Sequence, residues 1–97
     1  MTKPEIEITN GEVSSIFKAL SSKTRWKILK LLKKDKKLDI SRIAEALNQT
    51  EANISAQVKI LEKAGLIMSH YEPGERGVRK ICEPACEKLI IQIIKKE

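Results

Sequence analysis

Between Glu51 and Ala64, apolar residues recur with the spacing of one helical face. Ile54, Val58 and Leu61 stand at i, i+4 and i+7, which predicts an amphipathic helix that buries this stripe. At about 3.6 residues per turn, small and basic residues fall on the opposite face: Ala52, Ala56, Lys59 and Lys63. Such a face suits contact with a groove of DNA better than contact with water alone.

Three further helical patterns precede this segment, and a capping residue stands before most of them. The apolar spacing predicts helices over Glu12–Leu20, Lys23–Lys34 and Ile40–Leu47. The side chains placed to accept from free amides at helix starts are Ser22, Asp39 and Thr50.

A short turn joins the last two predicted helices. Asn48 and Gln49 separate Leu47 from the cap, so the pair predicts a helix-turn-helix whose second helix presents its polar face outward. Gly65 is placed to end that helix in a left-handed conformation, which glycine adopts at little cost.

After Gly65 the pattern changes to that of a hairpin and a final helix. Leu66–Glu72 and Val78–Cys82 are strand-like, and the turn residues 73–77 between them predict a two-stranded wing. Pro84 suits the first turn of a helix over Ala85–Lys96, whose apolar residues cover more than one face.

The whole pattern predicts a mainly α fold with a small β-hairpin, in the order α-α-α-α-β-β-α. We expect a flexible N-terminal arm over residues 1–11 and a single winged helix-turn-helix domain over residues 12–97. Aromatic residues make up only 3% of the chain, so the core must be mostly aliphatic.

Composition points to a nucleic-acid partner and away from membranes and secretion. The net charge of +6 attracts polyanions such as double-stranded DNA. Two cysteines do not make a secreted disulfide scaffold, and neither a signal peptide nor an apolar run of membrane-spanning length is seen. We therefore expect a cytoplasmic protein with no membrane partner.

The sequence contains no motif typical of a catalytic site. The sequence has no nucleophile with a plausible histidine base, no phosphate-binding loop and no dinucleotide fingerprint. We therefore expect no enzymatic activity, no cofactor and no resident metal. His70 stands alone on a strand and is interpreted as structural.

Four stretches resemble segments of the ArsR/SmtB family of winged-helix regulators. Phe17–Leu29 resembles the stretch that joins the family's first two helices, and Ile43–Asn48 resembles the helix before recognition. Thr50–Leu61 is similar to the recognition helix, and Leu61–Ile67 to the exit into the wing. The resemblance implies a homodimeric transcription regulator, usually a repressor, from a prokaryote and most simply an archaeon.

The resemblance and the side-chain chemistry together select candidate DNA contacts. Asn53 can pair with adenine, Ser55 can bond a base or a phosphate, and lysines can neutralise phosphates. An arginine at the wing tip can enter the minor groove or clamp a phosphate. The candidates are Thr50, Asn53, Ser55, Ala56, Lys59, Lys63, Arg76 and Arg79.

Strand alternation and two departures from the family pattern bear on which candidates contact DNA and how specifically. Arg79 and Lys80 alternate on one strand, so we expect one of the two to reach DNA. Glu51 and Ala56 depart from the family's polar or basic recognition residues, which bears on base specificity rather than on general DNA affinity.

In this family the first and last helices form the dimer interface. The resemblance therefore implies pairing through apolar residues of both segments, namely Val13, Ile16, Phe17, Leu89, Ile90, Ile93 and Ile94. Two-fold pairing would set two recognition helices about 34 Å apart, one turn of DNA.

Cys82 and Cys86 leave a second hypothesis open. Two thiolates separated by three residues can bind a soft metal or form a redox disulfide, but buried inert thiols explain the spacing as well. The alternatives to a DNA-binding regulator are therefore a thiol-based redox or soft-metal sensor of the same fold and a winged-helix module that binds another protein. A non-specific DNA-coating protein is a further one. The effector, if there is one, is not identified by the sequence.

Overall fold

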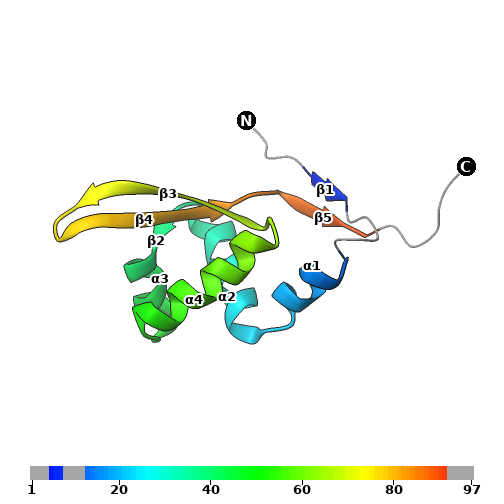
Figure 1. Ribbon diagram of the computed structural model, residues 1–97, viewed down its shortest axis with the longest axis horizontal. Coiled ribbons are helices and arrows are strands. Elements are labelled where there is room, and N and C mark those ends of the chain that lie inside the picture. The colour runs from blue at the N-terminus through cyan, green and yellow to red at the C-terminus, as the bar shows by residue number, and fades with distance from the viewer. Residues whose placement is uncertain (1–4, 8–12, 92–97) are drawn as a thin grey trace, which may run out of the picture.

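The computed structural model describes residues 5–7 and 13–91 (Figure 1). Four helices account for most of the regular structure: α1 (Val13–Leu20), α2 (Lys23–Asp35), α3 (Ile40–Leu47) and α4 (Glu51–Lys63). The strands are β1 (Glu5–Glu7), β2 (Leu38–Asp39), β3 (Ile67–Gly74), β4 (Gly77–Pro84) and β5 (Lys88–Ile90). All four predicted helices up to Lys63 are confirmed, with ends that shift by at most one residue.

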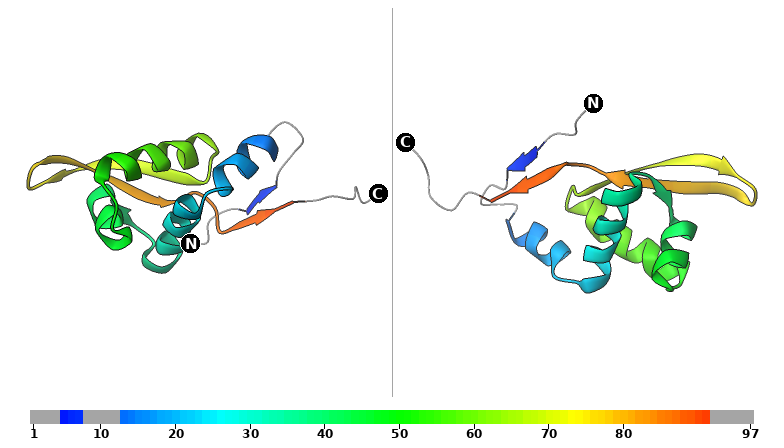
Figure 2. Two further views of the ribbon diagram at one scale, coloured as in Figure 1. Left: turned by 90° about the horizontal axis from the view of Figure 1, so that it is seen from below. Right: turned by 180° about the vertical axis from the view of Figure 1, so that it is seen from behind.

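Helices α2, α3 and α4 cover one face of a three-stranded antiparallel sheet of order β2-β4-β3 (Figures 1 and 2). The largest fully buried side chains are Ile28, Leu32, Ile43, Ile54, Leu61, Val58 and Cys82. This set contains the whole predicted stripe of α4, whose burial is confirmed. The core is aliphatic, as the composition required.

Polar side chains fix three helix starts. The side chains of Ser22, Asp39 and Thr50 accept hydrogen bonds from backbone amides three residues ahead, at 3.3, 2.7 and 3.1 Å. A capped amide no longer needs a partner from solvent, which favours a helix start at that residue. The three predicted caps are confirmed.

The wing is a longer hairpin than the sequence indicated. Strands β3 and β4 pair from Ile67 with Pro84 out to Gly74 with Gly77, so only Glu75 and Arg76 remain in the loop. The short strand β2 was not predicted, and it pairs with β4 at the foot of the wing.

The predicted last helix is wrong in the described residues. Pro84 ends β4, and Lys88–Ile90 forms β5, which pairs in parallel with β1. Leu89 and Ile90 continue into Ile91, and β-branched residues in succession favour an extended backbone when a pairing partner exists. The remainder of the predicted helix, including Ile93 and Ile94, lies outside the described residues.

Three residues of the expected N-terminal arm form a short strand. Glu5–Glu7 pairs with β5 in the register Glu5 with Lys88 and Glu7 with Ile90. The other residues of the predicted arm lie outside the described part of the chain. The two ends of the described chain therefore meet beside α1 (Figure 2).

Gly65 ends α4 with a φ of +79°, as predicted, and a Cβ there would meet no atom within 4 Å. Substitution therefore costs conformational energy without a clash. We expect Gly65→Ala to lower the free energy of unfolding by about 1–2 kcal/mol, measured by urea denaturation. Gly65→Asn should cost less, because asparagine tolerates this conformation; equal costs for the two variants would contradict this account.

Candidate nucleic-acid interface

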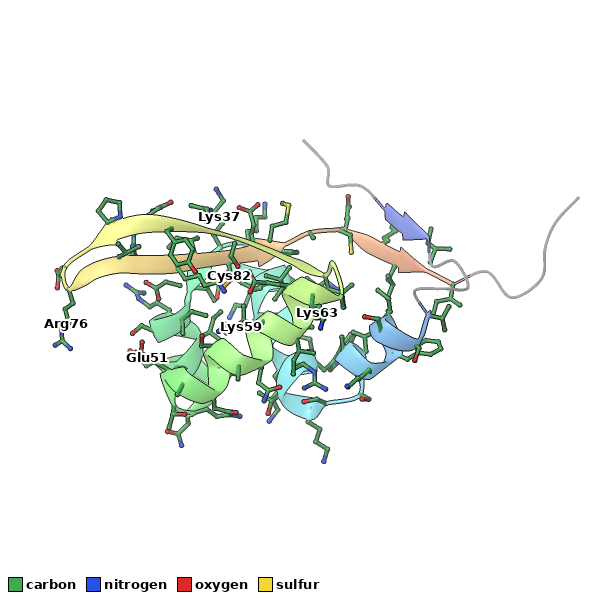
Figure 3. The ribbon with its side chains drawn as sticks, viewed as in Figure 1. Lys37, Glu51, Lys59, Lys63, Arg76 and Cys82 are labelled. Carbon is green, nitrogen blue, oxygen red and sulfur yellow. The ribbon has the colours of Figure 1, made fainter. Side chains whose placement is uncertain are left out.

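The outer face of α4 is exposed along its length. Ala52, Asn53, Ala56, Lys59 and Lys63 all lie at the surface, while Ile54, Val58 and Leu61 are fully buried beneath them. Figure 3 shows α4 along one side of the molecule, with Lys59 and Lys63 in its second half. The periodicity thus placed the outer face correctly, and a duplex can approach it without displacing another element.

The first turn of α4 combines a cap with an acid. The Oγ1 of Thr50 accepts from the backbone amide of Asn53 at 3.1 Å, so this hydroxyl caps the helix while its O–H can still donate. Glu51 follows at the surface, and Ser55 is half-buried. An acid in the first turn favours the helix dipole but repels phosphates, so it is badly placed for a backbone contact.

A chain of side-chain amides runs along α4, and sequence reasoning missed two of its members. Asn53 donates through Nδ2 to the Oε1 of Gln49, and Gln57 donates through Nε2 to the Oδ1 of Asn53 at 3.2 Å. We call Gln49, Asn53 and Gln57 the amide ladder. For Gln57 the available signal was its place four residues after Asn53, since side chains at i and i+4 meet on a helix. Gln49 precedes the cap, so this rule does not cover it.

The amide ladder is anchored at both ends. At one end the Nη1 of Arg25 donates to the Oε1 of Gln57 at 2.7 Å. At the other, the Nε2 of Gln49 donates to the Oγ1 of Thr24 at 3.2 Å. Both anchors belong to the first turn of α2, so the ladder joins α2 to the exposed edge of α4.

Arg25 also holds the end of α1. Its Nε donates to the carbonyl oxygen of Ala19 at 2.8 Å, and its Nη2 donates to that of Lys18 at 3.0 Å. These carbonyls belong to the last turn of α1, where helical partners run out. One guanidinium therefore connects three helices.

The wing tip presents Arg76 to solvent, as predicted. It lies in the loop between β3 and β4, and no described residue forms an ion pair with it. Figure 3 places Arg76 and Glu51 at the same end of the molecule, at the wing tip and the start of α4. The wing tip and the first turn of α4 therefore lie toward the same end of the molecule.

Arg79 and Lys80 both form ion pairs within the protein. Arg79 contacts Asp39 at 3.3 Å and Glu72 at 3.5 Å, whereas Lys80 donates to the Oε1 of Glu62 on α4 at 2.7 Å. The two side chains point to opposite faces of β4, as expected. Neither is a free cation, and a DNA contact by Arg79 would need it to leave both carboxylates.

These contacts shift two pKa values. The hydrogen bond from His70, at 2.6 Å, and secondarily the charges of His70 and Arg79 lower the pKa of Glu72. Burial alone would lower the pKa of Lys80, but the hydrogen bond and charge of Glu62 outweigh it and raise the pKa. Both shifts favour the charged forms of Glu72 and Lys80 at neutral pH.

The two cysteines lie in surroundings that disfavour the thiolate form. Cys82 is fully buried in the core and Cys86 is half-buried against it, and burial raises the pKa of both thiols. The thiolate is the form that binds metals and attacks disulfides. Within the described residues, no group of three or more His, Cys, Asp or Glu side chains is arranged to hold a metal ion.

The predicted dimer residues divide into buried and exposed sets. Ile16 is buried in the protomer's own core, and Val13 and Leu89 are partly buried against it. Phe17 is 48% exposed and Ile90 38% exposed. Helix α1 and strand β5 lie at the same end of the molecule, opposite the wing tip (Figures 1 and 2).

Comparison with known proteins identifies the family. A profile described as "Bacterial regulatory protein, arsR family" matches residues 22–69. An uncharacterized HTH-type transcriptional regulator of Methanocaldococcus jannaschii is 34% identical over 61 residues, which span 63% of this chain and 68% of the relative. The chain belongs to the ArsR family. It is thus a DNA-binding transcription regulator and not an enzyme.

Solved structures agree with this ArsR-family assignment. The homodimeric winged helix-turn-helix DNA-binding domain of a Mycobacterium bovis protein matches with a TM-score of 0.67 and 28% identity, covering 77% of this chain and 65% of that one. A transcriptional regulator homologue from Pyrococcus horikoshii matches at 0.62 and 26%, covering 77% and 76%. The winged helix-turn-helix prediction is confirmed. None of the helices in residues 13–91 is long and apolar enough to span a membrane.

The burial of Cys82 yields a test of the sensor hypothesis. We expect an aromatic disulfide reagent at pH 7.5 to label Cys86 well before Cys82, because a buried thiol reacts only when the fold opens. The Cys82→Ser, Cys86→Ser variant should bind DNA as the unmodified protein does, with or without oxidant. Fast labelling of Cys82 together with oxidant-dependent DNA affinity would instead support a thiol sensor.

Proposed function

We propose that the protein is a homodimeric repressor that reads the major groove with α4 and contacts the DNA backbone or minor groove with the wing. The supporting observation is the exposed outer face of α4, where Lys59 and Lys63 flank small side chains. A small, basic helical surface fits a groove lined by phosphates. We propose repression because the resemblance to the ArsR/SmtB family implies a repressor, and we propose that it acts in the cytoplasm.

The backbone contacts are assigned to unpaired cations. Lys59, Lys63 and Arg76 are exposed, and none of them forms an ion pair with a described residue. Arg79 is a weaker candidate than the sequence indicated, because it is already bound to Asp39 and Glu72. The basic and unpaired character of this face also argues against a module that binds only proteins.

Dimerisation is proposed through the end of the molecule that carries α1 and β5. Phe17, Ile90 and Ile91 expose 48, 38 and 42% of their surface there. A fold with so small an aliphatic core gains stability when such residues are covered. The homodimeric M. bovis domain supports a two-fold arrangement, in which the two copies of α4 would enter successive major grooves about 34 Å apart.

Removing one proposed phosphate contact should reduce the salt dependence of binding. Lys59→Gln removes one contact from each protomer, so we expect the slope of log K against log salt to become shallower by about 2. Binding of a fluorescent duplex between roughly 50 and 200 mM salt measures this slope by anisotropy.

Lys37→Gln is the matched control, since it removes the same charge from the other side of the sheet (Figure 3). Lys37 lies 4.0 Å from Glu83 and keeps its side chain 65% exposed. For Lys37→Gln, the slope of log K against log salt should stay close to that of the unmodified protein. Equal slopes for both variants would mean that α4 does not face the duplex.

The dimer proposal is tested by placing a cation at Phe17. Phe17→Lys should halve the mass measured by analytical ultracentrifugation and weaken duplex binding, because each protomer would bury an unpaired ammonium group in the interface. An added lysine would by itself strengthen binding to a polyanion, so weaker binding must come from loss of the dimer. Met68→Lys, on an equally exposed residue of β3, should remain dimeric; a dimeric Phe17→Lys would contradict the proposed interface.

A further inference from the structure

We infer that Gln49 and Gln57 are positioning residues that lock the amide of Asn53 in one orientation, so that it reads an adenine in each half-site. This inference rests on the proposed function. Asn53 is the third residue of α4 and is exposed, while its two ladder neighbours are half-buried. Residues near the start of a recognition helix are those that reach base edges.

The direction of every amide in the ladder follows from Arg25. A guanidinium carries donors only, so the group of Gln57 that faces it must be the oxygen, as the 2.7 Å contact shows. The nitrogen of Gln57 then faces Asn53 and requires an acceptor there, which is Oδ1. The nitrogen of Asn53 is left to face the oxygen of Gln49.

The last bond of the chain is consistent with the same direction. The nitrogen of Gln49 faces Thr24, whose hydroxyl accepts at 3.2 Å. A reversed Asn53 would set oxygen against oxygen at Gln49 and nitrogen against nitrogen at Gln57. Reversal therefore requires both glutamines to turn, which places the nitrogen of Gln57 against the guanidinium.

The ladder leaves Asn53 with a defined pair of groups for DNA. A side-chain amide has two N–H donors and two acceptor lone pairs, and the ladder uses one of each. One donor and one acceptor remain. Adenine presents N7 as an acceptor and its N6 amino group as a donor in the major groove, so this base matches the pair that is left.

The ladder also reduces the entropy lost on binding. A free asparagine on the surface must give up rotation when it pairs with a base, whereas Asn53 is already held between two neighbours. Holding Asn53 in one orientation should therefore affect discrimination between bases more than affinity for DNA in general.

The test begins with a duplex selected from a random pool by the full-length protein. Exchange of A·T for G·C at each position identifies where the protein prefers adenine, and we expect a loss of about 5- to 100-fold at one position of each half-site. Asn53→Ala should abolish the preference at that position alone.

Gln57→Met is the decisive variant, because it keeps the side-chain length and removes both ladder bonds of Gln57. We expect it to reduce the adenine preference about 2- to 10-fold and to leave the affinity for a random duplex unchanged. Because it also removes the acceptor of Arg25, the melting temperature should fall slightly, and binding is measured well below that temperature. In an Asn53→Ala background it should have no further effect at that position, since the amide it positions is gone.

Gln57→Glu tests the direction of the ladder separately. Its carboxylate still accepts from Arg25 but cannot donate to Asn53, so the adenine preference should again fall. The new charge repels every duplex, and the ratio of selected to random affinity removes that effect. Lys59→Gln is the contrasting control, which should weaken all duplexes and leave the preference intact.

Failure of the inference can be separated from failure of the proposed function. Unmodified protein that prefers no sequence would overturn both. Unmodified protein that prefers adenine while Gln57→Met keeps the full preference would overturn the inference alone. Additive effects of Asn53→Ala and Gln57→Met would do the same, because additivity means that the two side chains act independently.

Discussion

The burial of one face of α4 is the constraint on which the DNA-binding surface depends. Ile54, Val58 and Leu61 have no exposed surface, and they fix the rotation of the helix about its own axis. A rotation by one residue, about 100°, would bury a lysine and expose an isoleucine. The same apolar packing that stabilises the fold therefore decides that Lys59 and Lys63 face outward. Stability and recognition in this protein rest on one stripe of aliphatic side chains.

Polar contacts then tie that helix to its neighbours. Arg25 joins the end of α1 to Gln57 on α4, and Lys80 joins the wing to Glu62 on the opposite flank of α4. The core sets the rotation of α4, and these two contacts hold its flanks against α2 and β4. The recognition helix is thus held on three sides, with only its outer face free for a ligand.

The helices and caps could be predicted from sequence because their determinants are local. Periodicity over Glu51–Lys63 and a hydroxyl at Thr50 act within a few residues, and the structure confirms both. The last predicted helix failed because Leu89 and Ile90 suit either conformation, and the partner strand lies at the other end of the chain. Two side-chain pairs could not be predicted for the same reason. Arg79 lies 40 residues from Asp39, and Arg25 lies 32 residues from Gln57.

The length of the hairpin affects how the protein would contact DNA. Arg76 lies at the far tip of β3 and β4, where a free ribbon would move independently of α4. Two ion pairs restrict that motion from opposite faces of the wing, Lys80 with Glu62 on α4 and Arg79 with Asp39 at the start of α3. The wing is therefore tied to α4 and to the residue that caps α3. A duplex would meet α4 and Arg76 as one preformed surface, so little ordering of the wing would be lost on binding.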